Sequence, residues 1–181
     1  MSTITQRLQR LCKHRWTEGK VRHNFSAETL QHLERLVAAS EQLHTGQIRL
    51  CIEGGLPYSY IWRSASPRER ALGLFGKLRT WDTEHNNGVL IYLLMADHAI
   101  EIVADRALAR HVSPAQWNAL IAPMQTAFQL GDFVPGLEQT LQAVTGLLVQ
   151  HFPRHREDKS AQHISELPDA PVVQRRFFKD Q

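Results

Sequence analysis

The pattern of apolar and polar positions is most informative in the middle of the chain. A polar loop over residues 79–88 is followed by a continuous apolar run over residues 89–96. Two polar residues, Asp97 and His98, then lead into a second, partly alternating apolar run over residues 100–103. A short apolar run is typical of a strand buried on both faces, and a short polar break between two such runs is typical of a hairpin. The stretch therefore predicts a central strand with an antiparallel neighbour.

A strand and a helix are predicted upstream of this hairpin. Residues 47–53 alternate between apolar and polar positions, as a strand does. Residues 66–78 begin with serine, proline and, three positions after the serine, glutamate, and continue with apolar positions at helical spacing. Strand, helix and strand in this order form a βαβ unit, whose right-handed crossover makes the two strands parallel. Because the break at residues 97–98 is too short for a second crossover, the third strand runs antiparallel and the sheet is mixed.

The remaining pattern is mainly helical and predicts an α/β fold. A serine-capped helix is expected over residues 26–44, a second capped helix over residues 113–131, and a last helix over residues 132–151. Residues 58–65 read as a loop rich in aromatic side chains, and residues 107–112 as a short helical turn.

The chain divides into three parts. Residues 1–24 form a basic N-terminal segment with a short helix over residues 3–16, and residues 25–153 form the main domain. Residues 154–181 are a polar tail with prolines that cannot continue a helix, so we expect this tail to be mostly disordered or draped over the surface.

Length and cysteine usage limit the class of protein. The 181 residues suit one domain of ordinary size plus tails. No apolar run approaches the roughly 20 residues of a membrane-spanning helix, and the N-terminus lacks the apolar region of a secretory signal. The two cysteines, Cys12 and Cys51, form neither a CxxC pair nor a zinc-binding spacing. These features predict a location in the cytoplasm.

The net charge of +3 is unevenly distributed. Between residues 1 and 23 six Lys and Arg residues stand against Glu18 alone. Such a segment could contact an anionic membrane surface or a nucleic acid, but we favour a solvated basic face on a docking helix. No nucleic-acid partner is expected, because no helix-turn-helix, zinc-finger or RNP-like pattern accompanies the charge.

The predicted topology sorts the polar residues onto two ends of the sheet. Because the first two strands are parallel and the third runs back, the loop over residues 82–87 lies beside the start of the first strand and beside Asp105 and Arg106. We call this the first end. Glu53 and Asp97 lie at the second end, where open α/β sheets usually bind ligands. Asp97 is an ordinary turn residue, however, so the first end is the stronger candidate.

The first end carries side chains that could bind a divalent cation. Asp82, Glu84 and Asp105 offer hard oxygen ligands for Ca²⁺ or Mg²⁺, and Asn87 or loop carbonyls could complete the set. Arg106 could contact a phosphate oxygen in a forked geometry, which makes Asp82, Asp105 and Arg106 the candidates for catalysis. The alternative is structural: Asp82 caps a turn, Glu84 is solvated, and Asp105 forms an ion pair with Arg106.

Established phosphatase and nucleotide-binding motifs are absent from the sequence. A cysteine phosphatase needs Cys-x5-Arg, whereas the sixth residue after Cys12 is Glu18 and the sixth after Cys51 is Pro57. The sequence contains no Asp-x-Asp strand end, no GxxxxGK[ST] and no GxGxxG, so no organic cofactor is expected. Any hydrolysis would therefore use a metal-activated water held by carboxylates.

Short segments along the chain occur in the order found in a known domain. They are Thr45-Gly46-Gln47-Ile48-Arg49, Phe75, Asn87-Gly88-Val89-Leu90-Ile91, Asp97, Ile100, Gly131-Asp132-Phe133, Gly136-Leu137 and Phe152-Pro153. In this ordered set the chain resembles the TPM domain family, which is named after a thylakoid lumen phosphatase and its relatives. The resemblance covers roughly residues 25–153. Residues 81–88 and 101–106 look like those of a bacterial subgroup without a secretion signal.

The resemblance implies a three-layer α/β/α sandwich around a short mixed sheet, with helices on both faces. It also implies a site for Ca²⁺ or Mg²⁺ and, for some members, acid phosphatase activity, whereas other members are membrane-associated or accessory proteins. This chain departs from the family pattern at Gln47, where an acidic residue is common, and at Ala107, where glycine is common.

We therefore expect a TPM-type domain that binds a divalent cation and acts as an accessory or interaction module of a protein or membrane complex. The alternative is a metal-dependent acid phosphatase that uses the carboxylates of the first end. The expected partner is a protein. The chain itself is expected in the cytoplasm or at the periphery of a membrane.

Overall fold

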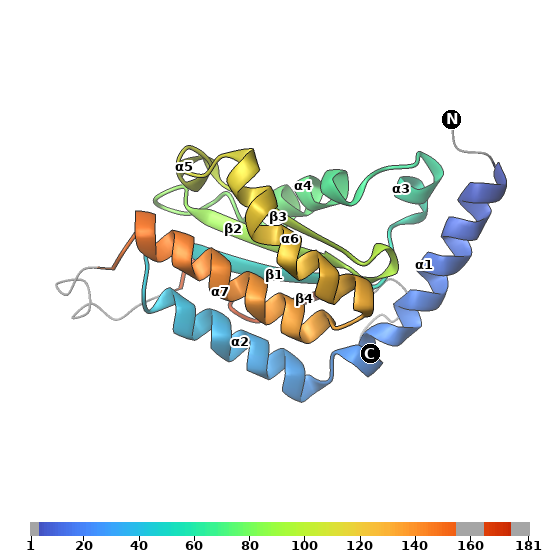
Figure 1. Cartoon of the computed structure of the whole chain (residues 1–181), viewed down its shortest axis with the longest axis horizontal. Helices are drawn as coiled ribbons and strands as arrows, with labels where there is room; N and C mark the ends of the chain where they lie inside the picture. Colours follow the sequence, from blue (N-terminus) through green and yellow to red (C-terminus); the bar gives the residue numbers. More distant parts are fainter. Residues whose placement is uncertain (1–3, 155–164, 175–181) are drawn as a thin grey trace.

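The computed structural model describes residues 4–154 and 165–174 of the chain. Its centre is a four-stranded mixed sheet in the order β3-β2-β1-β4 (Figure 1). Strands β1, β2 and β4 are parallel, and β3 is antiparallel to β2. The strands are β1 (Gln47–Glu53), β2 (Gly88–Leu94), β3 (Ala99–Ala104) and β4 (Val172–Gln174).

The predicted βαβ unit and hairpin are confirmed. Strand β1 pairs with β2 along its full length, from Gln47 opposite Gly88 to Glu53 opposite Leu94. The crossover helix is α4 (Pro67–Lys77), and the side chain of Ser66 caps it by accepting a hydrogen bond from the Glu69 N–H. The hairpin between β2 and β3 contains a 3-10 turn, η1 (Met95–Asp97), which His98 closes in a left-handed conformation.

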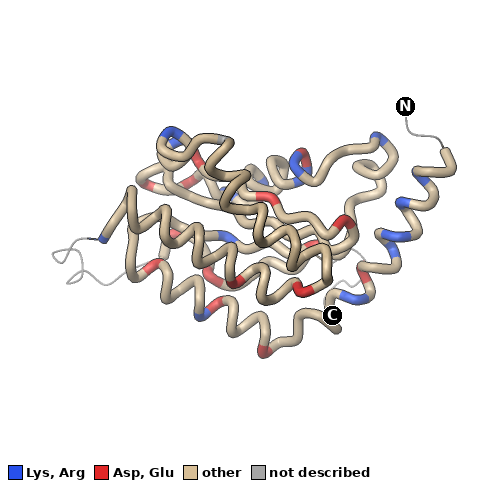
Figure 2. Tube along the Cα trace, viewed as in Figure 1, with Lys and Arg blue, Asp and Glu red and all other residues tan. Residues whose placement is uncertain are grey.

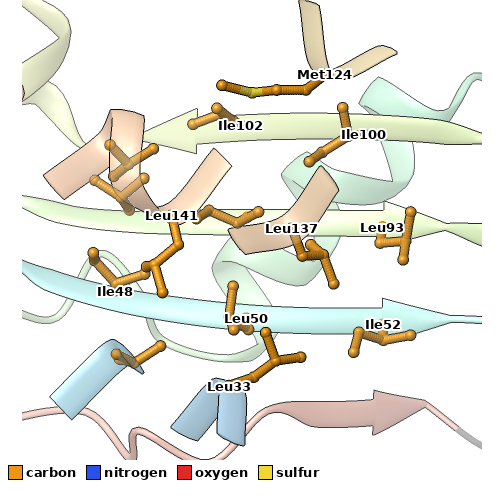
Figure 3. Packing of buried hydrophobic residues seen from close by; sticks show 14 of the residues in the cluster. Leu33, Ile48, Leu50, Ile52, Leu93, Ile100, Ile102, Met124, Leu137 and Leu141 are labelled. Carbon is orange, nitrogen blue, oxygen red and sulfur yellow. The ribbon is translucent and has the colours of Figure 1, made fainter. Parts of the chain in front are cut away.

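Helices cover both faces of the sheet, as in an α/β/α sandwich. Figure 3 shows the larger core, where Ile48, Leu50 and Ile52 of β1 meet leucines of helices α2 and α7. The opposite face of the sheet packs against α4 and the short helix α3. The helices on the larger core are α2 (Ala27–Glu41), α6 (Pro114–Leu130) and α7 (Phe133–His151).

The N-terminal segment differs from the prediction. Helix α1 (Ile4–Asn24) is one continuous helix of 21 residues and replaces the expected short helix and linker. It packs closely on the loop after β1: a Cβ at Gly54 would lie 2.6 Å from Val21 Cγ2, and one at Gly55 would lie 2.5 Å from the His14 carbonyl oxygen. This tertiary contact outweighs the poor helix propensity of Gly19.

Two smaller expectations are also corrected. Part of the expected aromatic loop is a helix, α3 (Tyr58–Trp62), whose Tyr58 and Trp62 rings stack. Trp81, an aromatic residue that would be expected to pack in the core, is half exposed. The expected turn after β3 is the short helix α5 (Arg106–Ala109).

The C-terminal tail contributes to the sheet. Residues 165–174 run beside β1, and β4 pairs in parallel with it, Cys51 opposite Val172 and Glu53 opposite Gln174. The expectation of a disordered or draped tail is therefore wrong for this segment, because β1 offers an unpaired edge that the tail completes. The other residues of the tail lie outside the described ranges. Within those ranges no helix has the length and apolar character needed to cross a bilayer.

Gly88 and Gly146 differ in the space available for a side chain. A Cβ at Gly88 would lie 1.9 Å from the Thr80 carbonyl oxygen, whereas one at Gly146, inside α7, would meet no atom within 4 Å. We expect Gly88→Ala to lower the free energy of unfolding by about 2–3 kcal/mol through overpacking. We expect Gly146→Ala to raise it by about 0.5–1 kcal/mol, because alanine loses less entropy in a helix. Urea denaturation of both variants checks this, and equal effects would refute the assigned contact.

Candidate functional site

The first end of the sheet is assembled around Gly88. Gly88 lies opposite Gln47 of β1, and its carbonyl oxygen accepts a 2.8 Å hydrogen bond from the Asp105 N–H just after β3. The neighbouring Asn86 contacts Arg106, whose Nε and Nη2 donate to Asn86 Oδ1 at 3.1 and 2.6 Å. The topology thus brings together the three chain segments that the sequence assigned to this end.

Two candidate ligands at this end each have a buried oxygen without a hydrogen-bond partner among the described residues. Asp105 Oδ1 accepts from the Arg106 N–H at 2.7 Å and caps α5, whereas Oδ2 is buried and unpartnered. Asn87 is fully buried; its Nδ2 lies 3.4 Å from Thr45 Oγ1, and its Oδ1 is unpartnered. Carboxylate and amide oxygens are the ligand types that Ca²⁺ and Mg²⁺ bind.

Thr80 is a third such residue, and no pattern in the sequence singled it out. Its hydroxyl is buried and also lacks a partner among the described residues. Its carbonyl oxygen lies against Gly88, so Thr80 and Asp105 both flank the same glycine. Only a residue without a Cβ leaves room for this approach. In the sequence, Gly88 was the one signal that another segment approaches closely here. That the approaching residue is Thr80, just after α4, is decided by tertiary packing.

The structure does not bring Asp82 and Glu84 into this group. Asp82 is exposed and pairs with Arg79 at 2.5 Å. Glu84 is exposed, and its N–H donates to the Glu166 carboxylate at 2.8 Å. The described ranges contain no group of three or more His, Cys, Asp or Glu side chains that could hold a metal ion. The charge available to a cation near Gly88 therefore comes from Asp105.

Arg106 is exposed and makes no side-chain ion pair with Asp105 in the described part of the chain; the two residues meet through the Arg106 backbone N–H. Its guanidinium group contacts the neutral Asn86 amide. The positive charge of Arg106 is therefore held at the first end without being neutralised by this contact.

The second end of the sheet is closed by internal contacts. Arg70 donates to both oxygens of the buried Glu53 at 2.9 and 2.8 Å, and Tyr92 Oη donates to Glu53 at 2.7 Å. Burial and then the charge of Glu53 raise the pKa of Tyr92, which remains a hydrogen-bond donor. The same two effects raise the pKa of the Cys51 thiol to about 12, so it is no nucleophile near neutral pH.

Asp97 serves to dock α1. Arg10 and His14 approach its carboxylate at 3.1 and 3.2 Å, and Lys13 at 3.7 Å. Burial alone would raise the pKa of Asp97, but hydrogen bonds and charge from His14 and Arg10 outweigh it and hold the pKa at about 2. His14 Nδ1 also accepts from the Leu56 N–H at 2.9 Å. The two carboxylates of the second end are thus engaged in folding contacts.

Comparison with known proteins decides the family. Residues 21–147 match the TPM domain, which is more than half of the chain. The chain belongs to the TPM domain family. A solved structure with the same fold is that of the BA42 protein from the psychrophilic bacterium Bizionia argentinensis, with a TM-score of 0.69 and 26% sequence identity. The likeness covers 82% of this chain and 94% of BA42. No curated protein sequence matches the chain significantly.

In this TPM domain the tail binds at Gln47, a position where the resemblance led us to expect an acidic residue. Gln47 Oε1 accepts the N–H groups of Glu166 and Leu167 at 2.9 and 3.1 Å. Arg49 Nη1 donates to the carbonyl oxygens of Pro168 and Ala170. A neutral amide at Gln47 suits this contact, because a carboxylate there would add another charge beside the buried Glu41. The substitution fits a first end that is partly covered by the chain's own tail.

Glu41 and Ser165 join the tail to the domain. The Glu41 carboxyl group is buried and accepts from the Ile48 N–H at 2.8 Å. Ser165 Oγ lies within 3.1 Å of four oxygen atoms, although it has one hydrogen to donate. They are Glu41 Oε2, Gln47 Oε1, the Leu167 carbonyl oxygen and Asp169 Oδ1. A protonated Glu41 can donate to Ser165, which accounts for one of these contacts without the Ser165 hydrogen.

The environment of Glu41 favours this protonated form. Burial is the largest influence and raises the pKa of Glu41 to about 7, although the Ile48 N–H, the Ser165 hydroxyl and Arg154 act to lower it. The charge of Asp169 acts in the same direction as burial. The attachment of the tail therefore depends on a carboxyl group that titrates near neutral pH.

The pH dependence of stability tests this arrangement. Because the pKa of Glu41 is higher in the folded than in the unfolded protein, its contribution is complete below about pH 4.5 and is lost as the pH rises through 7. We expect the free energy of unfolding to fall between pH 5 and pH 9 by roughly 2–3 kcal/mol more in the parent protein than in Glu41→Gln. Glu84→Gln, at an exposed carboxylate, should follow the parent curve in chemical denaturation. Parallel curves for the parent and Glu41→Gln would contradict the assignment.

Proposed function

We propose that this TPM domain binds a divalent cation, Ca²⁺ or Mg²⁺, at the first end of the sheet and acts as an accessory module of a protein complex. The observation that supports the proposal is a pair of buried oxygens, Asn87 Oδ1 and Asp105 Oδ2, that have no hydrogen-bond partner among the described residues. Asn87 precedes Gly88 in the chain, and the Asp105 N–H donates to the Gly88 carbonyl oxygen. Buried polar atoms normally have partners, and orphaned oxygens indicate a place for a cation or water.

The ligand set indicates weak binding. Asp105 supplies one negative charge, and Asn87 and Thr80 supply neutral oxygens. Fewer charged ligands lower the affinity for Ca²⁺, and sites of low charge bind at roughly 10⁻⁴–10⁻³ M. Water molecules would complete the coordination sphere, since both cations retain water readily when protein ligands are few.

An accessory role accounts for the side chains better than the alternative, a metal-dependent acid phosphatase. Such an enzyme would need a second carboxylate beside the metal and a cation that clamps the phosphate. Asp82 is paired with Arg79 on the surface, so the second carboxylate is missing even though Arg106 could contact a phosphate. Cys51 is buried and protonated near neutral pH. These contacts leave no complete set of nucleophile, base and phosphate clamp among the described residues.

The cation site is tested by titrating the protein with Ca²⁺ and with Mg²⁺ while recording amide NMR spectra. We expect saturable shifts at Gly88 and Asp105. Asp105→Asn should weaken binding at least tenfold, because asparagine keeps the helix cap but removes the charge. Asp82→Asn is the matched control and should change the affinity less than twofold. No saturable shift, or equal losses in the two variants, would refute the site.

The same protein would be assayed for hydrolysis of an aryl phosphate. We expect no turnover above the background of the buffer with either cation present. Turnover that disappears in Asp105→Asn would instead support the phosphatase and overturn the accessory role.

A further inference from the structure

One end of the molecule gathers exposed apolar side chains. Helix α1 lies across this end beside α3, whereas the other helices pack on the faces of the sheet (Figure 1). Among the described residues ten large hydrophobic side chains are exposed, and five of them belong to these two helices. They are Ile4, Leu8, Trp16, Tyr58 and Trp62, and Trp16 is 72% exposed. Aromatic residues are three of the five, which is unusual for a surface that faces water alone.

The same end is strongly basic. Helix α1 carries six Lys and Arg residues and one acid, Glu18, and Figure 2 shows the blue positions along this helix. Of these cations, Arg10 and Lys13 face Asp97. Arg15, Lys20 and Arg22 are exposed. The docking of α1 therefore engages two of its six Lys and Arg residues, and three others are exposed.

Helical geometry places exposed cations and exposed apolar residues on the same half of α1. His14 and Val21 are buried and mark the inner side, where the partly buried Glu18 also lies. At 100° per residue, the half opposite His14 and Val21 contains Leu8, Arg15, Trp16 and Lys20, whereas Ile4 and Arg22 lie at its border, with Arg22 one turn from Glu18. An outer face with cations, a tryptophan and no acid differs from the solvated basic face that we favoured from the sequence.

Contacts on this surface pair aromatic rings with cations. The Lys20 ammonium group lies 3.7 Å from the Trp16 ring centroid, and the Arg7 guanidinium lies 5.7 Å from that of Trp62. Trp62 also stacks on Tyr58. Tryptophan and tyrosine next to Lys and Arg are the residues that settle at the headgroup level of a bilayer.

An apolar cavity opens within the same surface. It lies between α1 and α3, has a volume of about 270 Å³, and is lined mainly by apolar side chains, including Leu11, Leu56 and Ile61. His14, Arg15 and Glu18 also line it. An anionic lipid headgroup would match the charge of Arg15, and apolar lipid atoms would match the apolar side chains of the cavity.

From these observations we infer that the outer face of α1, together with α3, binds the surface of an anionic lipid bilayer. The helix lies in the plane of the surface, because a helix of this charge cannot enter the hydrocarbon region. Attraction of Lys and Arg to anionic headgroups brings the protein to the membrane, and the tryptophans anchor it at the interface. This inference does not depend on the cation site at the first end, which lies at the opposite ends of β1 and β2.

The test uses the full chain and vesicles of phosphatidylcholine, either pure or with about one third phosphatidylglycerol. EDTA is present throughout, so that no divalent cation bridges protein and lipid. We expect sedimentation with the anionic vesicles, a blue shift of tryptophan fluorescence, and at least tenfold weaker binding at about 0.5 M salt. Pure phosphatidylcholine vesicles should bind at least tenfold less protein.

A pair of variants locates the surface. Trp16→Ala/Lys20→Glu should weaken binding to the anionic vesicles at least tenfold. Trp81→Ala/Lys77→Glu changes one exposed tryptophan and one exposed lysine elsewhere and should stay within twofold of the parent protein. Circular dichroism confirms that both variants are folded. Absence of binding to anionic vesicles, or an equal loss in the two variants, would overturn the inference. Binding to polyglutamate instead of vesicles would also overturn it and would indicate an acidic protein partner.

Discussion

The complete burial of β2 is the constraint on which the rest of the structure depends. Every residue from Gly88 to Leu94 is buried, so both faces and both sides of this strand need cover. Strands β1 and β3 satisfy its backbone groups, α4 covers one face, and α2, α6 and α7 cover the other. Polar side chains that could bind a ligand are therefore found at the two ends of the strands and not in the middle of the domain.

The two ends use their polar groups differently. At the second end Glu53 is fully bonded to Arg70 and Tyr92, and Asp97 binds the basic residues of α1. These buried charges have partners, as burial requires. At the first end Asn87 and Asp105 retain oxygens that no described residue contacts. Because of this contrast, the proposed cation site is at the first end, although open α/β sheets more often bind ligands at the other end.

The N-terminal helix and the tail lie largely outside the residues that match the TPM domain, and they cover these two ends. Helix α1 closes the second end and turns its basic, aromatic outer half away from the domain. The tail extends the sheet at β1 and covers part of the first end through Gln47 and Glu84. The position of the tail depends on a buried acid, Glu41, whose pKa of about 7 places its titration near neutral pH. Helix α1 and the tail thus each cover one end of the same central strands.

The sequence by itself determined the sheet order of the first three strands, their directions and the helices between them. Residue periodicity, capping residues and the shortness of the break at Asp97 are local signals, and they were sufficient for this part of the fold. They also placed Asn87 and Asp105 at one end, because strand direction follows from the connections. Helix α1 was underestimated, since its continuation through Gly19 depends on packing against Gly54 and Gly55.

Only the tertiary structure decided which polar groups have partners. Gln47 and Glu166 are 119 positions apart, and Glu41 and Ser165 are 124 positions apart, so no local pattern predicts these contacts. The position of Thr80 beside Gly88 is likewise decided by packing. The pairing of Asp82 with Arg79 is local, because the two residues are three positions apart. Periodicity predicts which face a residue lies on, whereas the partners of its polar atoms depend on segments brought together by folding.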